Sequence, residues 1–362
     1  MKYAVNRIRL HSFKNFRELT YNVSSGKIFG RGSEGKTNLL SAISALVLNQ
    51  EMDGSRIFPL TDGAQAGGID IEWKVDGATL QSYREWRRTD TGFASTGTPP
   101  DFDRFEFMLI HNPLYLFCVS HAERRELIVD MAYKDVKSDL LSELSADTEP
   151  WVKTFARNFG KIDTKRLRHL LKQSRADSKM IADQIKIIEA QMAVIEDPDI
   201  LCEKSAELDN CNNQLETLQE TMSAIQIVES QLISNAIEYL NPKMILTSFA
   251  TDGKIIHNDR PMEFLSGSER LEAGLDIANM VAGIATKGIP PTVIDNAALY
   301  GKSDIDMDLY SNLSQVITAS YADVDLCEYN QNCLVAVDQS WKVPVQEEFR
   351  MNVQIEMIPF AI

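Results

Sequence analysis

The segment 30–38, which reads G-R-G-S-E-G-K-T-N, constrains the fold more than any other part of the chain. It fits the phosphate-binding loop pattern G-x-x-x-x-G-K-[ST], in which glycines let backbone N–H groups close around phosphates at a helix N-terminus. Residues 27–29 before it are typical of the end of a strand, and apolar residues recur at helical spacing over residues 39–46 after it. The sequence therefore predicts a strand, a phosphate-binding loop and a helix.

Two positions of this loop pattern have specific chemical roles. Lys36 contacts the nucleotide phosphates, and the Thr37 hydroxyl is placed to bind Mg²⁺. The predicted nucleotide-binding residues of the loop are Gly30, Gly32, Ser33, Gly35, Lys36, Thr37 and Asn38. The alternative is a Gly-rich turn that begins an ordinary helix, and it explains neither Lys36 nor the partner motif near Asp295.

Length and composition exclude several classes of protein. The 362 residues, 44% hydrophobic and 25% charged, favour a soluble globular chain of two domains or one domain with an insertion. A formal charge of −15 confines any contact with DNA to a local patch. Five scattered cysteines without a C-x-x-C pair favour reduced thiols and a cytoplasmic protein, and no signal peptide or membrane span is expected.

The first half of the chain reads mainly as strands. Residues 3–23 alternate between apolar and polar positions, and residues 69–75 and 80–84 flank the turn pair Asp76-Gly77 as a β-hairpin. The Gly-, Thr-, Ser- and Pro-rich stretch 89–100 predicts an exposed loop. The apolar run 105–110 predicts a buried strand.

The segment 161–240 changes to a heptad pattern. Apolar residues step by four and three along residues 181–195, and a similar pattern runs over residues 208–225. Pro198, between the two runs, must interrupt any helix. We expect an antiparallel coiled-coil hairpin on the order of 50 Å long, because each arm of about 35 residues rises 1.5 Å per residue. Two core helices of a globular domain are the alternative.

Charge is divided unevenly between the two arms. Residues 161–186 hold eight Lys or Arg against three Asp, and residues 203–238 hold one Lys against seven acidic residues. One hypothesis is that the positively charged start of the first arm contacts a DNA backbone. The residues that would make this contact are Lys165, Arg166, Arg168 and Lys172. The other is that the complementary arms hold each other in register.

Three motifs follow one another along the chain. The first is I-R-L-H-S-F-K-N-F-R, residues 8–17, followed by the phosphate-binding loop. The second is F-L-S-G-S-E-R-L, residues 264–271, and the third is the apolar run 290–295, which ends in Asp295. The second is similar to the ABC signature L-S-G-G-[QE] and the third to a Walker B strand. In this order the three motifs resemble those of the SMC, RecF and SbcC group of ABC-type ATPases.

The resemblance implies a fold and a set of domains. The expected fold is an α/β ABC-type P-loop ATPase head with an inserted antiparallel coiled-coil hairpin. Residues 1–160 would form the N-terminal half of the head, residues 161–240 the hairpin, and residues 241–362 the C-terminal half, whose strands near 333–337 and 351–357 would complete the sheet. Asn112 stands where such heads place a residue that senses the γ-phosphate, although an Asn that caps a turn before Pro113 is the simpler alternative.

The resemblance also implies cofactors and a partner. The cofactors would be ATP and Mg²⁺, with Thr37 and Asp295 on the metal. Ser266, Gly267 and Ser268 would bind the γ-phosphate of a nucleotide held by a second copy, so the working unit would be a homodimer with two sandwiched ATP molecules. The simpler alternative is that Ser266 or Ser268 caps a helix.

Two departures from the family pattern concern catalysis. The position after the Walker B Asp, where most ABC ATPases have a catalytic Glu, is Asn296, and Ala298 stands where related sequences have a further Glu. Slow hydrolysis is therefore expected, with Asp295 and Asn296 as the residues at the catalytic position. The predicted function is ATP-switched DNA recombination, repair or replication, with a separate nuclease subunit as a candidate partner. The alternative is a nucleotide-dependent clamp that scarcely hydrolyses ATP.

Overall fold

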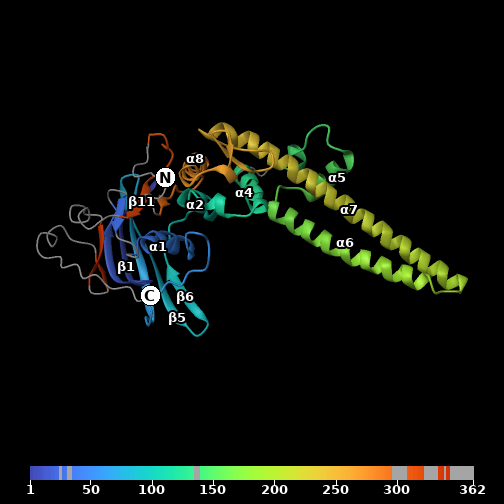
Figure 1. Cartoon of the computed structure of the whole chain (residues 1–362), viewed down its shortest axis with the longest axis horizontal. Coiled ribbons are helices and arrows are strands. Elements are labelled where there is room, and N and C mark those ends of the chain that lie inside the picture. The colour runs from blue at the N-terminus through green and yellow to red at the C-terminus, as the bar shows by residue number, and fades with distance from the viewer. Residues whose placement is uncertain are drawn as a thin grey trace, which may run out of the picture. The chain divides into compact units, whose positions relative to one another are not determined.

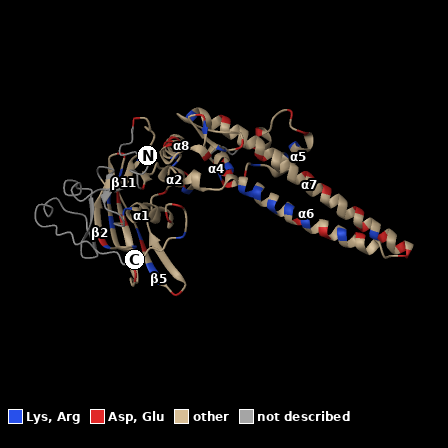
Figure 2. Ribbon diagram, viewed as in Figure 1, with Lys and Arg blue, Asp and Glu red and all other residues tan. Residues whose placement is uncertain are grey.

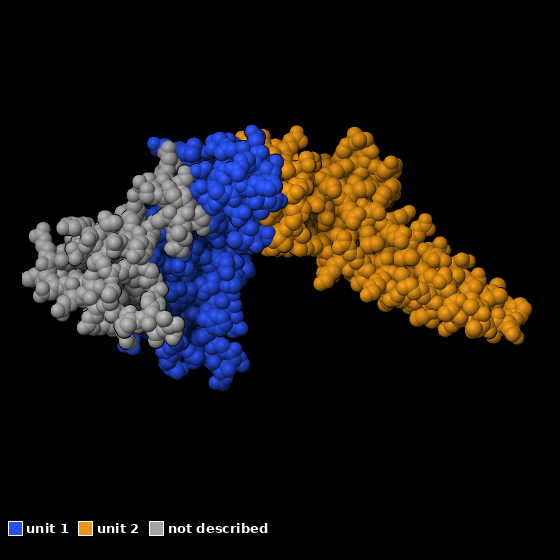
Figure 3. Space-filling view, in the orientation of Figure 1, with its two compact units in different colours: residues 1–119, 244–247, 256–362 blue, residues 120–243, 248–255 orange. Residues whose placement is uncertain are grey.

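The computed structural model describes seven stretches of the chain: residues 1–23, 27–30, 35–133, 139–295, 308–321, 333–337 and 340–342. For residues 27, 29, 30, 320, 321 and those from 333 onward, only the backbone is described. The chain forms two compact units (Figure 3). Unit 1 comprises residues 1–119, 244–247 and 256–362, and unit 2 comprises residues 120–243 and 248–255. Unit 2 therefore begins before residue 161, where the sequence placed the start of the hairpin.

Unit 1 contains a five-stranded antiparallel sheet in the order β2-β1-β4-β5-β6 (Figure 1). Its strands are β1 (Tyr3–Phe13), β2 (Phe16–Asn22), β4 (Ala66–Val75), β5 (Ala78–Thr89) and β6 (Gly92–Gly97). The predicted hairpin is confirmed, because β4 and β5 pair from Val75↔Ala78 to Ala66↔Arg87 around the turn at residues 76–77. This sheet supplies much of the apolar surface against which the rest of unit 1 packs.

Two sequence predictions in this region are wrong. The expected loop 89–100 contains β6, which pairs with β5 from Thr89↔Gly92 to Arg84↔Gly97. The expected strand 105–110 lies in a helix, α2 (Arg104–His111). The Asp103 carboxylate accepts hydrogen bonds from the backbone N–H groups of Phe105 and Glu106, which is a helix N-cap. A short apolar run fits a buried helix as well as a buried strand.

A second sheet in unit 1 is mostly parallel and has the order β10-β11-β3-β12-β13. It contains β3 (Lys27–Gly30), β10 (Thr292–Ile294), β11 (Val316–Tyr321), β12 (Cys333–Val337) and β13 (Ser340–Lys342). The first four strands run parallel, with β3 between β11 and β12. The prediction that a C-terminal strand joins the sheet of the phosphate-binding loop is confirmed for β12. The second predicted tail strand, 351–357, lies outside the described residues.

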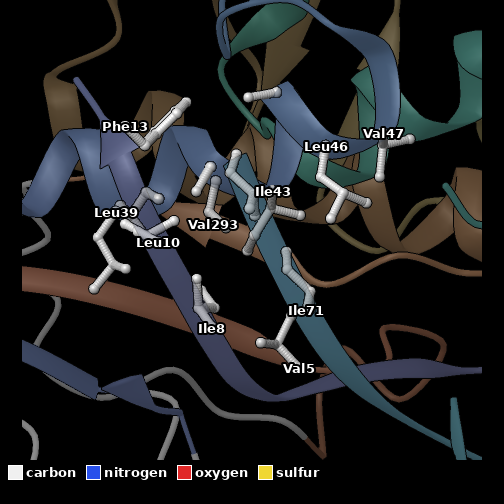
Figure 4. Close-up of a cluster of buried hydrophobic side chains, with 14 of the residues drawn as sticks. Val5, Ile8, Leu10, Phe13, Leu39, Ile43, Leu46, Val47, Ile71 and Val293 are labelled. Atoms are coloured by element: carbon white, nitrogen blue, oxygen red, sulfur yellow. The ribbon is translucent and has the colours of Figure 1, made fainter. Parts of the chain in front are cut away.

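Helix α1 (Lys36–Leu48) forms the centre of the core of unit 1. Its side chains Leu39, Ile43 and Leu46 are buried against residues of both sheets, among them Ile8 of β1 and Val293 of β10 (Figure 4). The helix is apolar on nearly all sides, which is the pattern of a helix enclosed by the protein. The start of α1 is therefore held in place by both sheets.

The C-terminus of α1 is fixed by the antiparallel sheet. The Arg84 guanidinium on β5 donates from Nε to the carbonyl oxygen of Leu46 at 2.7 Å. Trp86 Nε1 on the same strand donates to Asn49 Oδ1 at 2.7 Å, and Asn49 ends the helix with a left-handed φ of 57°. A cation and an indole N–H therefore cap the negative end of the helix dipole.

Helix α8 (Gly267–Ile284) of unit 1 packs against α2 and the short α3 (Tyr115–Cys118). Close approach requires a glycine here, since a Cβ on Gly274 of α8 would lie 2.1 Å from the carbonyl oxygen of Pro113. Three short strands form a third sheet. They are β7 (Thr247–Phe249), β8 (Ile255–His257) and β9 (Arg260–Pro261).

Unit 2 is helical. It consists of α4 (His121–Tyr133), α5 (Pro150–Phe159), α6 (Thr164–Met192) and α7 (Pro198–Leu240), with a short 3₁₀ helix at Leu140–Glu143. Helices α6 and α7 pack along each other, and α7 also packs against α4 and α5. The predicted helix break is confirmed, because α7 begins at Pro198 after an N-cap at Asp197.

The heptad positions form the contact surface between α6 and α7. Ile181, Ile188 and Cys211 are buried there, and five partly buried side chains pack around them: Ile185, Met192, Leu208, Leu215 and Leu218. Among the described helices, none has both the length and the apolar character needed to cross a membrane.

His111 links α2 to the start of the β10 strand inside unit 1. Its side chain is 1% exposed, stacks on Phe107 and places Nδ1 2.8 Å from the carbonyl oxygen of Pro291. Burial lowers the pKa of His111 to about 4, because the charged imidazolium is poorly solvated there. The neutral ring is therefore the form that the folded protein accommodates.

We predict that protonation of His111 destabilises unit 1 in mild acid. The unfolded pKa is about 6.5, so the unfolded chain binds more protons below that pH, and the contribution of His111 to stability is lost as the pH falls towards 4. The loss is on the order of 3 kcal/mol at full protonation. About half of this loss, roughly 2 kcal/mol, falls between pH 7.0 and 5.0. Denaturant unfolding at these two pH values measures it in the wild type and in His111→Phe, which keeps an aromatic stack and removes the titration. An equal loss in both proteins would exclude His111 as the cause.

Candidate functional site

The first turn of α1 meets the end of β10 in unit 1. The Thr37 hydroxyl donates a hydrogen bond to Asp295 Oδ2 at 2.5 Å, although the two residues are 258 positions apart. They meet because β3 and β10 are parallel strands of one sheet, so that their carboxyl ends lie at the same edge. The structure therefore brings together the two residues that the sequence assigned to one metal ion.

The second carboxylate oxygen of Asp295 is suited to bind a cation. Asp295 Oδ1 is buried, and within the described part of the chain it accepts no hydrogen bond. A buried carboxylate oxygen without a donor is costly unless a cation or water satisfies it. Together with the Thr37 hydroxyl it offers the oxygen ligands that Mg²⁺ prefers, so the residues present fit that ion.

The chain does not provide a complete metal cage at this edge. No cluster of three His, Cys, Asp or Glu side chains able to hold a metal occurs among the residues that the structure describes. Mg²⁺ is typically bound by one or two protein groups together with water and substrate phosphates. The pair Thr37 and Asp295 matches that pattern and does not match a structural zinc site.

Gly35, directly before α1, occupies a position that only glycine fits. Its φ is +80°, and a Cβ there would lie 2.6 Å from Asn15 Nδ2 and 2.8 Å from Phe16 Cζ. Asn15 also accepts a hydrogen bond from Asn38 Nδ2 at 2.7 Å through Oδ1. The turn between β1 and β2 therefore touches the end of the phosphate-binding loop.

Lys14 fixes the same turn to α1. It has a left-handed φ of 51°, and its Nζ donates to Ser41 Oγ at 2.9 Å and to Glu51 Oε2 at 2.7 Å. Sequence reasoning used S-F-K-N-F only as a family resemblance and assigned no role to Lys14 or Asn15. The signal was the pair of polar residues between two buried phenylalanines, Phe13 and Phe16, which places a tight turn beside the core.

The structure describes some of the other predicted loop residues but not all of them. Lys36 is 7% exposed at the start of α1, and Gly30 ends β3. Gly32, Ser33 and Asn296 lie outside the described residues, so their predicted roles stay predictions.

The signature-like segment forms the N-terminus of α8. Ser266 is the N-cap of the helix: its Oγ accepts from the Glu269 N–H at 3.3 Å, and the Glu269 carboxylate accepts from the Ser266 N–H at 2.7 Å. The Ser266 N–H lowers the pKa of Glu269, as do Ser266 Oγ and the nearby Arg260. Arg260 also donates to the Phe264 carbonyl oxygen at 2.7 Å, which holds the loop before the helix.

The helix cap proposed for Ser266 as the simpler alternative is thus confirmed. Ser268 lies beside it, with its Oγ 3.1 Å from Ser266 Oγ. Gly267 is the first residue of α8, so its N–H lies at the positive end of the helix dipole. Binding of Ser266, Gly267 and Ser268 to a nucleotide held by a second copy stays a prediction.

Asn112 takes the role of a turn cap. Its Oδ1 accepts from the Leu114 N–H at 3.1 Å, and its Nδ2 donates to the Met52 carbonyl oxygen at 3.2 Å. The turn before Pro113 that the sequence offered as the alternative is therefore confirmed. Both polar ends of this side chain are occupied by backbone groups.

Basic residues gather along the first part of α6 (Figure 2). Arg166 donates to the Phe159 carbonyl oxygen at 3.2 Å and lies over the Phe159 ring, and Arg168 pairs with Glu126 of α4. Lys165 and Lys172 are exposed. Among the described residues no ion pair joins α6 to α7, but Arg175 and Arg168 of α6 act electrostatically on Glu229 of α7, so the hypothesis of complementary arms stays a prediction. A DNA contact through these four residues stays a prediction.

Sequence comparison gives one local match. No protein-family model matches the chain. Over 75 residues the chain is 35% identical to the DNA replication and repair protein RecF of Carboxydothermus hydrogenoformans. That match covers 20% of this chain and 21% of the relative, so about a fifth of the relative's length is compared.

Comparison with solved structures gives distant matches over most of the chain. An Smc head domain with an extended coiled coil from Pyrococcus furiosus, bound to the C-terminal domain of ScpA, is 14% identical with a TM-score of 0.43, covering 94% of this chain and 96% of that one. A structure of the recombination mediator RecF with ATP is 12% identical with a TM-score of 0.41, covering 94% and 97%. The SMC head domain from Thermotoga maritima is 14% identical with a TM-score of 0.35, covering 96% and 100%.

The observed elements define the fold of the chain. The buried helix α1 carries Lys36 and Thr37 and follows β3 in sequence, a parallel strand brings Asp295 to Thr37, and a capped helix begins at Ser266. A long helical hairpin separates these motifs in sequence. These elements and their order are those that the sequence motifs predict for an ABC-type ATPase head.

The crowding at Gly35 yields a prediction with a matched control. Gly35→Ala and Gly63→Ala both place a Cβ on a backbone with a φ of +80°, but nothing lies within 4 Å of the Cβ at position 63. We expect Gly63→Ala to lower the unfolding free energy by about 1 kcal/mol. We expect Gly35→Ala to cost about 1–3 kcal/mol more, because Asn15 and Phe16 must move. Denaturant unfolding of both variants measures the difference, and equal costs would contradict the close approach.

Proposed function

We propose that this chain binds ATP with Mg²⁺ and acts as an ATP-switched DNA-maintenance protein of the SMC and RecF kind. The observation that carries the proposal is the contact of Thr37 with Asp295, which joins the phosphate-binding loop to the Walker B position. The local identity to a DNA replication and repair protein supports the choice of DNA recombination, repair or replication as the process.

In the proposed site the chain's own groups bind and orient the triphosphate. Backbone N–H groups at the start of α1 face the phosphates at the positive end of the helix dipole, and Lys36 supplies a cation beside them. Asn15 and Lys14 hold the loop end and α1 in place through Asn38 and Ser41. Thr37 and Asp295 would hold Mg²⁺, which when bound offsets negative charge on the phosphates.

The second part of the proposal is a homodimer closed by ATP. The N-terminus of α8 carries free helix N–H groups and two hydroxyls in an exposed position, which suits an anion. A γ-phosphate held by Lys36 of one copy would be bound by Ser266, Gly267 and Ser268 of the other. Nucleotide binding would then favour the closed dimer, and loss of the γ-phosphate would favour the open state.

The proposal has two versions, which differ in the rate at which the protein hydrolyses ATP. Asn296 cannot act as a carboxylate base, and Ala298 has no side chain able to do so. Slow turnover that is stimulated by DNA corresponds to an ATPase that works in DNA repair in the cytoplasm, with a separate nuclease subunit as a candidate partner. A lasting ATP-bound dimer without phosphate release corresponds to a clamp or scaffold, which the formal charge of −15 favours.

We predict that ATP causes the purified protein to dimerise through contacts at Ser268. In light scattering with Mg²⁺ present, addition of ATP should increase the mass of the wild type. Lys36→Ala should remove both ATP binding and the increase. Ser268→Glu should retain ATP binding within about threefold and lose the increase, because a carboxylate at the N-terminus of α8 repels the γ-phosphate of the nucleotide held by the other copy, whereas Ser268→Ala serves as the control for loss of the hydroxyl alone.

The same proteins distinguish the proposed activity from its rival. Phosphate release that rises with duplex DNA and disappears in Lys36→Ala supports the ATPase, and a stable ATP-bound dimer without release supports the clamp. An increase in mass that persists in Ser268→Glu would contradict the sandwiched dimer.

A further inference from the structure

Unit 2 contains a groove that the proposed function does not use. It has a volume of about 500 Å³ and lies among α4, α6 and α7 near the base of the hairpin, and we name it the root groove. Its floor is aliphatic. The apolar residues that line it are Val129, Leu167, Leu171, Leu232 and Ile233.

Basic side chains surround this apolar floor. Arg125, Arg168, Lys172 and Arg175 line the groove together with two carboxylates, Glu126 and Glu229. Arg168 is paired with Glu126, whereas Lys172 and Arg175 form no ion pair with a described residue. The groove therefore offers an apolar floor whose rim carries four Lys or Arg side chains against two carboxylates, and Arg125, Arg175 and Arg168 act electrostatically on Glu229.

These features favour a protein segment over a DNA backbone as the occupant. A phosphate backbone would gain nothing from five aliphatic side chains, and the carboxylate of Glu229 would repel it. A segment with protruding apolar side chains flanked by acidic ones would satisfy both the floor and the rim. The apolar floor and basic rim of the groove thus favour a partner segment with both apolar and acidic side chains.

The hairpin tip of this same chain has that chemistry. We define the tip as residues 194–203, which contain no Lys or Arg. Val194 is 81% exposed, Ile200 46% and Leu201 38%, which is unusual for aliphatic side chains so close in sequence. Four exposed acidic residues stand among them: Glu196, Asp197, Asp199 and Glu203.

We propose that the hairpin tip of one copy docks into the root groove of a second copy. Val194, Ile200 and Leu201 would cover the aliphatic floor, and the acidic residues of the tip would face Lys172 and Arg175. This contact needs no nucleotide, so it is separate from the ATP-closed dimer of the heads.

The geometry of the hairpin allows two such contacts at once. From Leu171 in the groove to the tip, α6 and its end span about 24 residues, or on the order of 36 Å at 1.5 Å per residue. In an antiparallel pair of hairpins related by a two-fold axis, each tip lies at that distance from its own groove and reaches the partner's groove. Both contacts are then equivalent, and the assembly is closed.

A cross-linking experiment on the full chain without nucleotide tests the contact directly. Cys202 is an exposed native thiol in the tip, so Lys172→Cys creates a potential pair between tip and groove. A short bis-maleimide should give a covalent dimer with Lys172→Cys, and Cys202→Ser in the same protein should remove it. Lys179→Cys is the matched control, since Lys179 is an exposed α6 residue that does not line the groove.

Charge reversal tests the same contact in solution. In sedimentation at low salt, Lys172→Glu with Arg175→Glu should weaken self-association at least tenfold, and Asp199→Lys with Glu203→Lys should do the same. Combining all four changes should restore it. Equal cross-linking by Lys172→Cys and Lys179→Cys would overturn the proposal. So would a loss of duplex-DNA affinity on groove reversal with self-association unchanged, or a failure of the combined reversal to restore association.

Discussion

The hydrogen bond between Thr37 and Asp295 is the contact on which the functional account depends. It exists because two strands far apart in sequence run parallel in one sheet and end at the same edge. Neither residue defines a site alone: a threonine such as Thr37 is ordinary in the first turn of a helix, and Asp295 alone would be a half-buried carboxylate at the end of a strand. When Thr37 and Asp295 are hydrogen-bonded, the other carboxylate oxygen of Asp295 is buried without a described donor. This oxygen is therefore available to bind a cation next to the predicted phosphate-binding loop.

Unit 1 is built so that this edge is held from several sides. Helix α1 is enclosed by both sheets, its C-terminus is capped by Arg84 and Asn49, and its first turns are tied to the β1–β2 turn through Lys14 and Asn15. Most of these groups come from the antiparallel sheet, which itself carries none of the predicted nucleotide-binding residues. Positioning of the site is therefore a property of the N-terminal strands as much as of the loop.

Sequence reasoning succeeded where the residues themselves fix the local structure. The strand β3 and the helix α1 on either side of the predicted loop form as expected, α7 begins at Pro198, and the heptad positions are buried between α6 and α7. It failed at residues 105–110, where a six-residue apolar run carries no periodicity and the signal was the single N-cap Asp103. It also failed at β6, whose small and polar residues are held in a strand by pairing with β5. The roles of Lys14 and Arg84, like the root groove, arise from tertiary contacts that no local pattern encodes.

The central claim is that Thr37 and Asp295 act as one Mg²⁺ site, and a double-mutant cycle on ATP affinity tests it most directly. Calorimetry of the wild type, Thr37→Ala, Asp295→Asn and the double variant, with Mg²⁺ and with EDTA, gives the coupling between the two positions. The account predicts that each single change weakens Mg²⁺-dependent ATP binding about tenfold or more, and that the double variant loses little beyond either. It predicts small effects in EDTA. Additive losses, or losses of the same size in EDTA, would contradict it.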